Sequence, residues 1–182
     1  AAGRETRLRE TRGTSLVDPT RAWLHWQVTP LNWSAPVQVR ALLRTSACNT
    51  RLTRTRAYEG RHLDVEPAAT DEGVAVLART TDGTRCVRVE SRLQCAGASV
   101  DAAESDPTAL VQQQTLGAQA GRAFDIGLQV RELAAGEAPA AAAPAGHAAL
   151  AAAQREAWHT LWQHAHIEAP GGDALARGCR LC

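Results

Sequence analysis

Histidines follow one another closely near the end of the chain, at His159, His164 and His166. Imidazole is a common metal ligand, so this cluster raises the hypothesis of a metal site. If the segment is helical, however, His159 and His164 are five residues apart and lie on different faces, whereas a shared ion needs an i, i+4 pair. We therefore expect solvated or interdomain histidines and no metal.

Cysteine chemistry is the next candidate. The five cysteines are Cys48, Cys86, Cys95, Cys179 and Cys182, an odd number without the spacing of a disulfide framework. The last two form a C-x-x-C pair, which is the spacing of half a zinc site or of a redox pair, but there is no second such pair. We expect free thiols in a reducing compartment, which favours the cytoplasm.

Acid–base and nucleophilic groups give little further support for catalysis. Asp64, Glu66, Asp71 and Glu72 form an acidic patch that we interpret as exposed loop charges. Ser15 has no His and Asp that the sequence places nearby. There is no glycine-rich loop that would cradle a phosphate. We expect neither catalytic residues nor a cofactor in this chain.

The charge pattern argues against two classes of partner. The net charge is +1, and all 20 basic residues are Arg, interspersed with acidic residues. The basic stretch 40–61 lacks the aromatic interleaving that stacks bases, so we interpret it as a solvated face and expect no nucleic acid partner. No apolar run is long enough to span a bilayer, so we expect no membrane partner.

Alternating apolar and polar residues predict the elements that must position these side chains. Residues 22–43 alternate except at Pro30 and Asn32, which indicates two strands joined by a turn. Asp82-Gly83 lies between two short alternating runs and predicts a hairpin, and residues 123–133 predict another strand. Residues 99–120 fit a helical segment or a loop, with an exposed glutamine run. Together these features predict a mainly β chain, with an antiparallel β-sandwich over 1–133.

A connector and a helix follow the predicted sandwich. Residues 134–146 are rich in Ala and Pro and predict a linker. The periodicity from His147 to Ala165 predicts an amphipathic helix that ends before Pro170, and residues 147–182 would then hold this helix and the start of a further domain. Trp158, Leu161 and Trp162 share one face. We expect this face to pack against a large neighbour, which makes the chain a piece of a longer protein.

Several short segments, taken in order, carry a resemblance to a known family. They are Leu31-Asn32-Trp33-Ser34, Asn49, Gly60-Arg61-His62-Leu63, Ala157-Trp158 and Leu161-Trp162. This order and spacing resembles the N-terminal region of glycoside hydrolase family 65, which includes maltose, trehalose and kojibiose phosphorylases and related α-glucosidases and trehalases.

The resemblance implies an N-terminal sandwich, a helical linker and a separate barrel of paired α-helices that holds the catalytic carboxylate. It implies that this chain alone is inactive and belongs to an enzyme acting on α-glucosides, with the barrel as its partner, a carbohydrate as substrate and a homodimer as one arrangement. Arg61 and His62 would lie at the rim of the sugar site. The alternative is a stand-alone carbohydrate-binding or scaffolding sandwich.

Overall fold

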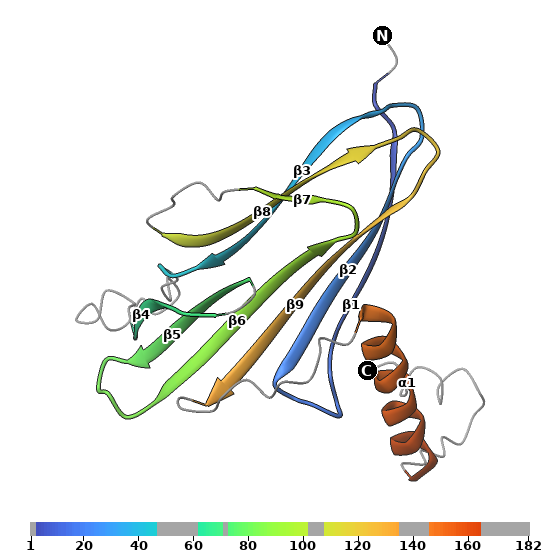
Figure 1. The fold of residues 1–182 in the computed structure, drawn as a ribbon. Coiled ribbons are helices and arrows are strands. Elements are labelled where there is room, and N and C mark those ends of the chain that lie inside the picture. Colours follow the sequence, from blue (N-terminus) through green and yellow to red (C-terminus); the bar gives the residue numbers. More distant parts are fainter. Residues whose placement is uncertain (1–2, 47–61, 71–72, 102–107, 135–145, 165–182) are drawn as a thin grey trace, which may run out of the picture.

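The described part of the chain folds into two antiparallel sheets and one helix. The computed structural model describes residues 3–46, 62–70, 73–101, 108–134 and 146–164. Within these residues, six strands form a large sheet and three form a small one, and the two sheets lie face to face as a sandwich (Figure 1). The prediction of a mainly β chain with an antiparallel sandwich and a C-terminal helix is confirmed.

The large sheet has the strand order β1-β2-β9-β6-β5-β4, and every neighbouring pair is antiparallel. Its strands, in chain order, are β1 (Thr6–Thr14), β2 (Arg21–Pro30), β4 (Leu63–Ala68), β5 (Val74–Thr80), β6 (Cys86–Cys95) and β9 (Phe124–Ala134). The register places residues 100 positions apart opposite each other, for example Trp26 and Ile126. Strands β2 and β9 therefore lie side by side in the large sheet although they are far apart in the sequence.

The small sheet has the strand order β3-β8-β7, with β3 at Ala35–Arg44, β8 at Ala109–Ala118 and β7 at Ser99–Asp101. Residues 99–120 were predicted to be a helical segment or a loop, and this prediction is wrong. Strand β8 lies between β3 and β7, so its backbone is paired on both sides. Such pairing between distant segments is decided by tertiary contacts and not by local propensity.

The core lies between the two sheets. Its buried cluster holds Val39, Ala41, Leu93, Leu116 and Ile126, which come from β3, β6, β8 and β9. The predicted alternation is confirmed here, because Val37, Val39 and Ala41 of β3 and Phe124, Ile126 and Leu128 of β9 all belong to this core or pack against it. In β2 the same alternation sends Trp26 and Val28 to this core and leaves Trp23 and His25 on the opposite face of the large sheet.

The predicted hairpin joins β5 to β6. Gly83 has a φ of 71°, a left-handed conformation that glycine adopts without steric cost. Asp82 fixes the turn, because its Oδ1 accepts hydrogen bonds from Thr80 Oγ1, Thr84 N and Thr84 Oγ1. The turn therefore follows from local chemistry alone.

Two edge strands of the large sheet were not predicted. Strand β1 is exposed along nearly its whole length, and β4 holds Asp64 and Glu66, which we had interpreted as loop charges. Both carboxylates are exposed, as expected, but they stand on a strand paired with β5. Charged, exposed residues are common on edge strands because they discourage pairing with other chains. Asp71 and Glu72 lie outside the described residues.

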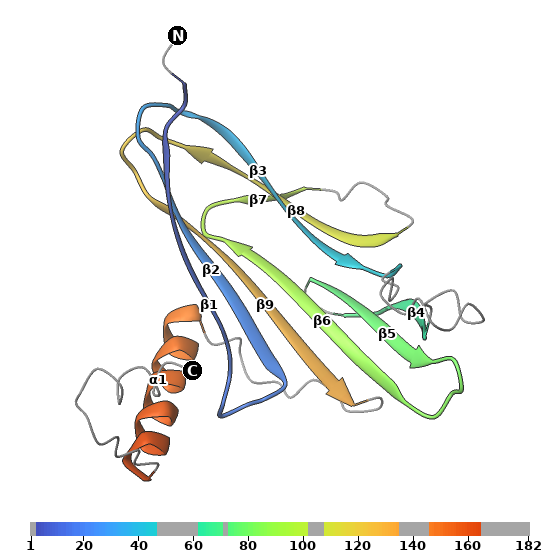
Figure 2. The ribbon, with the colours of Figure 1, turned by 180° about the vertical axis from the view of Figure 1, so that it is seen from behind.

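The helix α1 (His147–His164) stands beside the β1–β2 end of the large sheet in both views (Figures 1 and 2). None of its residues is buried. The predicted helix is confirmed, and Pro170 lies outside the described part of the chain. Among the described residues, no helix has the length and apolarity that crossing a membrane would require.

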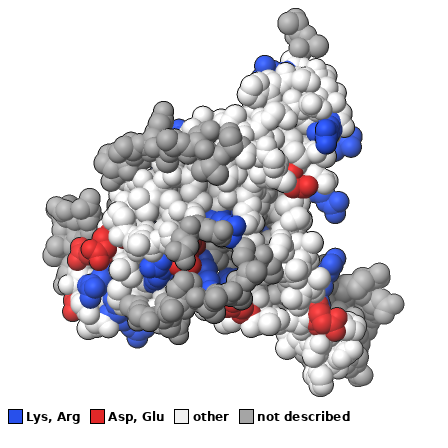
Figure 3. All heavy atoms as spheres, in the orientation of Figure 1, with Lys and Arg blue, Asp and Glu red and all other residues white. Residues whose placement is uncertain are grey.

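The surface charges are mixed. On the face that Figure 3 shows, Arg side chains lie at several separate places with Asp and Glu between them. Strand β1 illustrates the pattern, since Arg12 lies 3.6 Å from Glu10 in an exposed ion pair. Of the basic stretch 40–61, Arg40 and Arg44 lie on β3, and residues 47–61 are outside the described residues.

Candidate functional site

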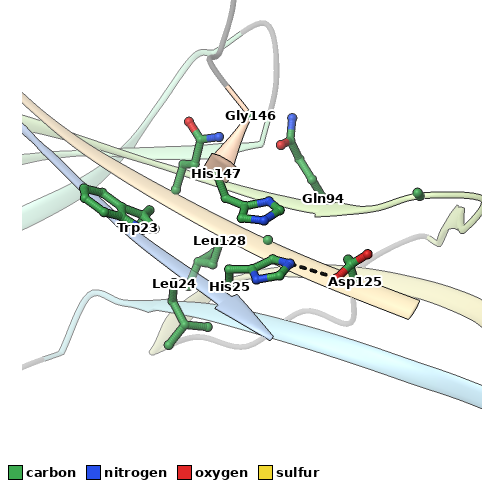
Figure 4. Close-up of a pocket in the computed structure, with 11 residues that line it drawn as sticks. Trp23, Leu24, His25, Gln94, Asp125, Leu128, Gly146 and His147 are labelled. Carbon is green, nitrogen blue, oxygen red and sulfur yellow. Dashed lines mark hydrogen bonds and ion pairs between the residues drawn. The ribbon is translucent and has the colours of Figure 1, made fainter. Parts of the chain in front are cut away.

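A small pocket lies on the outer face of the large sheet, where the start of α1 meets β2 and β9. Its volume is about 170 Å³. Its polar lining comes from His25, Gln94, Asp125, Gln129 and His147, and its remaining lining from Trp23, Leu24, Ala96, Gly127, Leu128 and Gly146. Figure 4 shows His147 lying above His25, with Asp125 beside it. Four segments that are distant in sequence thus meet at one place.

The sheet register explains how the imidazole of His25 is held. Gly127 lies directly opposite His25 on β9, so the two neighbouring strands bring His25 to the same face of the sheet as Asp125. Asp125, two residues along the same face of β9, brings its Oδ1 to 3.0 Å from His25 Nε2. His25 is 9% exposed, whereas the Asp125 side chain is 52% exposed. The carboxylate therefore remains hydrated while it orients the buried ring.

The second imidazole comes from the helix. The rings of His25 and His147 stack with their centroids 3.4 Å apart and their planes within 6° of parallel. Burial lowers the pKa of His147 below its usual value, the nearby His25 lowers it further, and the carboxylate of Asp125 acts in the opposite direction. His147 is also the first residue of α1, where the helix dipole disfavours a positive charge. The neutral form of His147 is therefore favoured.

Trp23 completes one wall of the pocket. Its indole is 5% exposed, and its Nε1 is buried with no hydrogen-bond partner among the described residues. The ring lies over Gly13 of β1, where an added Cβ would come within 2.7 Å of it. Because the indole is covered in this way, its face is not open for stacking on a sugar ring.

The described lining lacks the full set of side chains that a catalytic triad would need, and its two imidazoles are not placed to share a metal ion. The described lining holds a His–Asp pair but no Ser, Thr or Cys nucleophile, so it lacks the third member of a triad. Two parallel stacked imidazoles hold their nitrogen lone pairs in separate planes, which do not converge on one ion. Within the described residues no cluster of His, Cys, Asp and Glu is arranged to bind a metal. The pocket is therefore a contact between helix and sheet.

The predicted rim residue His62 lies elsewhere. His62 is exposed and immediately precedes β4, and its backbone carbonyl accepts a hydrogen bond from Thr81 N at 3.1 Å. Strand β4 is the far edge of the large sheet, separated from β9 by β6 and β5. The structure therefore does not bring His62 to the pocket. Arg61 lies outside the described residues.

The predicted packing residues share one face of α1. Trp158 and Trp162 stack with their ring centroids 6.1 Å apart. Trp158 is 40% exposed and Leu161 is 44% exposed, while Trp162 is half-buried. This stripe is an apolar surface that remains partly exposed.

His159 and His164, the other described histidines of the helix, are both exposed. His159 Nε2 lies 3.0 Å from Gln163 Nε2, and His164 Nδ1 lies 2.9 Å from the Thr160 carbonyl oxygen. Each contact joins positions four residues apart within α1. His166 and the pair Cys179 and Cys182 lie outside the described residues.

Sequence reasoning did not identify the pocket. His25 was placed on a strand face and His147 at the start of a helix, but nothing in the sequence pointed to Asp125. The only available signal was that His25 and Trp23 are two residues apart on a predicted strand and therefore share one face. A tryptophan on that face indicates that another part of the protein covers it.

The fold of the described residues defines a class of protein, namely an antiparallel sandwich of six and three strands that precedes a helix. The chain belongs to glycosyl hydrolase family 65, because the model of that family's N-terminal domain matches residues 1–169. The resemblance inferred from the sequence is thereby confirmed.

A solved structure shares the fold. It is described as "Putative kojibiose phosphorylase from human microbiome" and is similar to this chain with a TM-score of 0.59 and 8% sequence identity. The match covers 90% of this chain and 19% of that protein, so this chain spans about a fifth of its length. No curated protein sequence matches the chain.

Proposed function

We propose that this chain is the non-catalytic N-terminal sandwich of an enzyme that cleaves α-linked glucosides such as trehalose, maltose or kojibiose. The observation that carries the proposal is the match of residues 1–169 to the N-terminal domain of glycosyl hydrolase family 65. The similar fold of a protein described as a kojibiose phosphorylase supports the substrate class.

The chemistry of the pocket supports a non-catalytic role. Glycoside cleavage generally needs two carboxyl groups on opposite sides of the scissile bond. The described pocket holds a single carboxylate, Asp125, and this group is engaged with His25. The catalytic carboxylate would then belong to another domain of the same protein.

The stripe of Trp158, Leu161 and Trp162 supports a domain contact. We assign it to packing against a barrel of paired helices in the same protein, with Arg61 and His62 at the rim of the sugar site. Exposed aromatic and aliphatic side chains that lie together mark such contacts, because covering them removes apolar area from water. A contact between two copies of the protein would be a second arrangement.

The cysteines support a cytoplasmic location. Cys86 and Cys95 are free thiols that lie on the same strand, β6. Free thiols are typical of proteins in a reducing compartment.

The first test is an activity assay on the purified 182-residue chain. We expect it to release neither glucose nor, with phosphate present, glucose 1-phosphate from trehalose, maltose or kojibiose. A complete family 65 phosphorylase is the positive control. Saturable turnover that survives rigorous purification would contradict the non-catalytic role.

The second test addresses the rest of the protein. We expect the coding sequence that follows Cys182 to continue in frame with paired helical patterns and a barrel carboxylate. If it does not, calorimetry with gluco-oligosaccharides distinguishes the alternative, since measurable binding by this chain alone would favour a stand-alone carbohydrate-binding module.

A further inference from the structure

We propose that the stacked rings of His25 and His147 form an acid-sensitive contact that holds the start of α1 on the outer face of the large sheet. We call these two residues the histidine pair. When both rings are protonated, the contact opens and the helix leaves the sheet. This inference is independent of which glucoside the enzyme cleaves.

The attachment of α1 to the sandwich depends on few contacts. The histidine pair joins its first residue to β2, and Gln154 Oε1 accepts a hydrogen bond from Leu16 N at 2.6 Å. No residue of α1 is buried, so there is no apolar core between helix and sheet in the described residues. Loss of the histidine pair would therefore remove a large share of what holds the helix in place.

The geometry allows one positive charge but not two. A proton on His25 is compensated by Asp125, whose Oδ1 lies 3.0 Å from Nε2. A second proton on His147 would place a like charge on a parallel ring with the centroids 3.4 Å apart. Like charges this close repel strongly in a partly buried site. The helix dipole adds to the cost, because His147 is the first residue of α1.

Among the described residues near the pair, no other group compensates that second proton. Asp125 is the only carboxylate in the described pocket lining. On the same face of the sheet, the nearest charged positions of the flanking strands are Arg9 on β1 and Arg92 on β6, which lie opposite Gln27 and Gln129. Both are arginines, so neither offers a negative charge to the pair. The first turn of α1 has no acidic residue. Lowering the pH therefore adds positive charge to the pair without a second described carboxylate to neutralise it.

The direction of the pH dependence follows from linkage. The pKa of His147 is lowered from 6.5 in the docked state, chiefly by burial, so the undocked state binds the extra proton more readily. Docking is then favoured above pH 6.5 and weakens as the pH falls below it. If His147 takes up no proton in the docked form, the ratio of docked to undocked helix falls by up to about 30-fold between pH 8 and pH 5.

The experiment is an NMR titration of the histidine-labelled chain from pH 8 to pH 5. We expect a nuclear Overhauser cross-peak between the rings of His25 and His147 at pH 8, and we expect it to disappear as His147 becomes protonated. His147→Phe keeps a flat ring over His25 but takes up no proton, so its cross-peak should persist to pH 5. His159→Gln removes an exposed histidine from the same helix and should behave like the wild-type chain.

Three results would overturn the proposal. The first is a cross-peak that persists to pH 5 in the wild-type chain. The second is a loss whose midpoint differs from that of His147 protonation, because this would report general acid unfolding. The third is an equal loss in His147→Phe. The wild-type titration alone decides the matter if that variant fails to fold.

Discussion

Gln112 of β8 completes the hydrogen bonding of Leu93 in β6. Gln112 Oε1 accepts a hydrogen bond from Leu93 N at 2.8 Å, and Gln114 Nε2 donates to Leu93 O at 3.1 Å. Strand β5 pairs with β6 only as far as Val74 opposite Ser91, so no residue of β5 lies opposite Leu93. Two amide side chains of the small sheet thus extend the pairing of the large sheet and tie the two layers together.

Replacing Gln112 by Leu should therefore destabilise the sandwich. The variant leaves the Leu93 amide without its acceptor in a partly buried place, which costs about 1–3 kcal/mol of the free energy of unfolding. Urea denaturation measures this loss. The control is Gln113→Leu, on the opposite face of β8, with an expected change within about 0.5 kcal/mol. Equal losses of stability in both variants would show that the hydrogen bond between Gln112 and Leu93 contributes nothing specific.

The glutamine run shows where sequence reasoning failed. Three consecutive polar residues indicate an exposed segment when composition alone is considered. In the structure Gln112 and Gln114 are half-buried, because the strand they meet has backbone groups in need of partners. These backbone groups lack strand partners because β5 ends before it reaches Leu93. A local sequence pattern does not show where the neighbouring strand ends.

Features fixed by local chemistry were predicted correctly. The hairpin at Asp82-Gly83 and the face shared by Trp158 and Trp162 follow from spacing within a few residues. Strand β1 was missed because an exposed edge strand needs no apolar alternation. The pocket was missed because His25 and Asp125 are 100 residues apart and meet only through the register of β2 and β9.

Gly13 should not tolerate a larger side chain. A Cβ at this position would lie 2.7 Å from the Trp23 indole, which is 5% exposed and has little room to move. We expect Gly13→Ala to lower the free energy of unfolding by about 1–3 kcal/mol. Gly117→Ala is the matched control in β8, since no atom lies within 4 Å of its added Cβ. Thermal unfolding of both variants checks the prediction, and a harmless Gly13→Ala would contradict this position of the indole.

The turn at Asp82 should lose its contribution to stability in acid. The hydrogen bond from the Thr80 hydroxyl, followed by those from the Thr84 backbone and hydroxyl, lowers the Asp82 pKa from 3.8 to about 2. A lowered carboxyl pKa stabilises the folded chain above pH 3.8, and this contribution is lost as the pH falls toward 2. We expect Asp82→Ala to unfold at a lower temperature than the wild-type chain at pH 6.

The pH dependence of that difference is the measurement. The gap in melting temperature between the wild-type chain and Asp82→Ala should shrink as the pH falls from 4 to 2. Asp82→Asn keeps an acceptor oxygen without the charge, so its melting temperature should lie between the other two at pH 6. A gap that stays constant across this range would assign the effect to packing and not to the ionised carboxylate.

Truncation of two tryptophans of this chain should change the free energy of unfolding by very different amounts. Trp158 is 40% exposed on α1, so Trp158→Ala should change the free energy of unfolding by no more than about 0.5 kcal/mol. Trp23 is 5% exposed, so Trp23→Ala should cost about 3–5 kcal/mol. Chemical denaturation of the two variants and the wild-type chain measures both changes in the free energy of unfolding.

The same variants test what the apolar stripe on α1 is for. If Trp158, Leu161 and Trp162 form a surface that another domain covers, the isolated chain should bind a hydrophobic dye, and Trp158→Ala should bind less of it with unchanged stability. A loss of stability in Trp158→Ala as large as that in Trp23→Ala would mean that the indole already packs within this chain. The stripe would then have no area left to offer a barrel domain, and the proposed domain contact would fail.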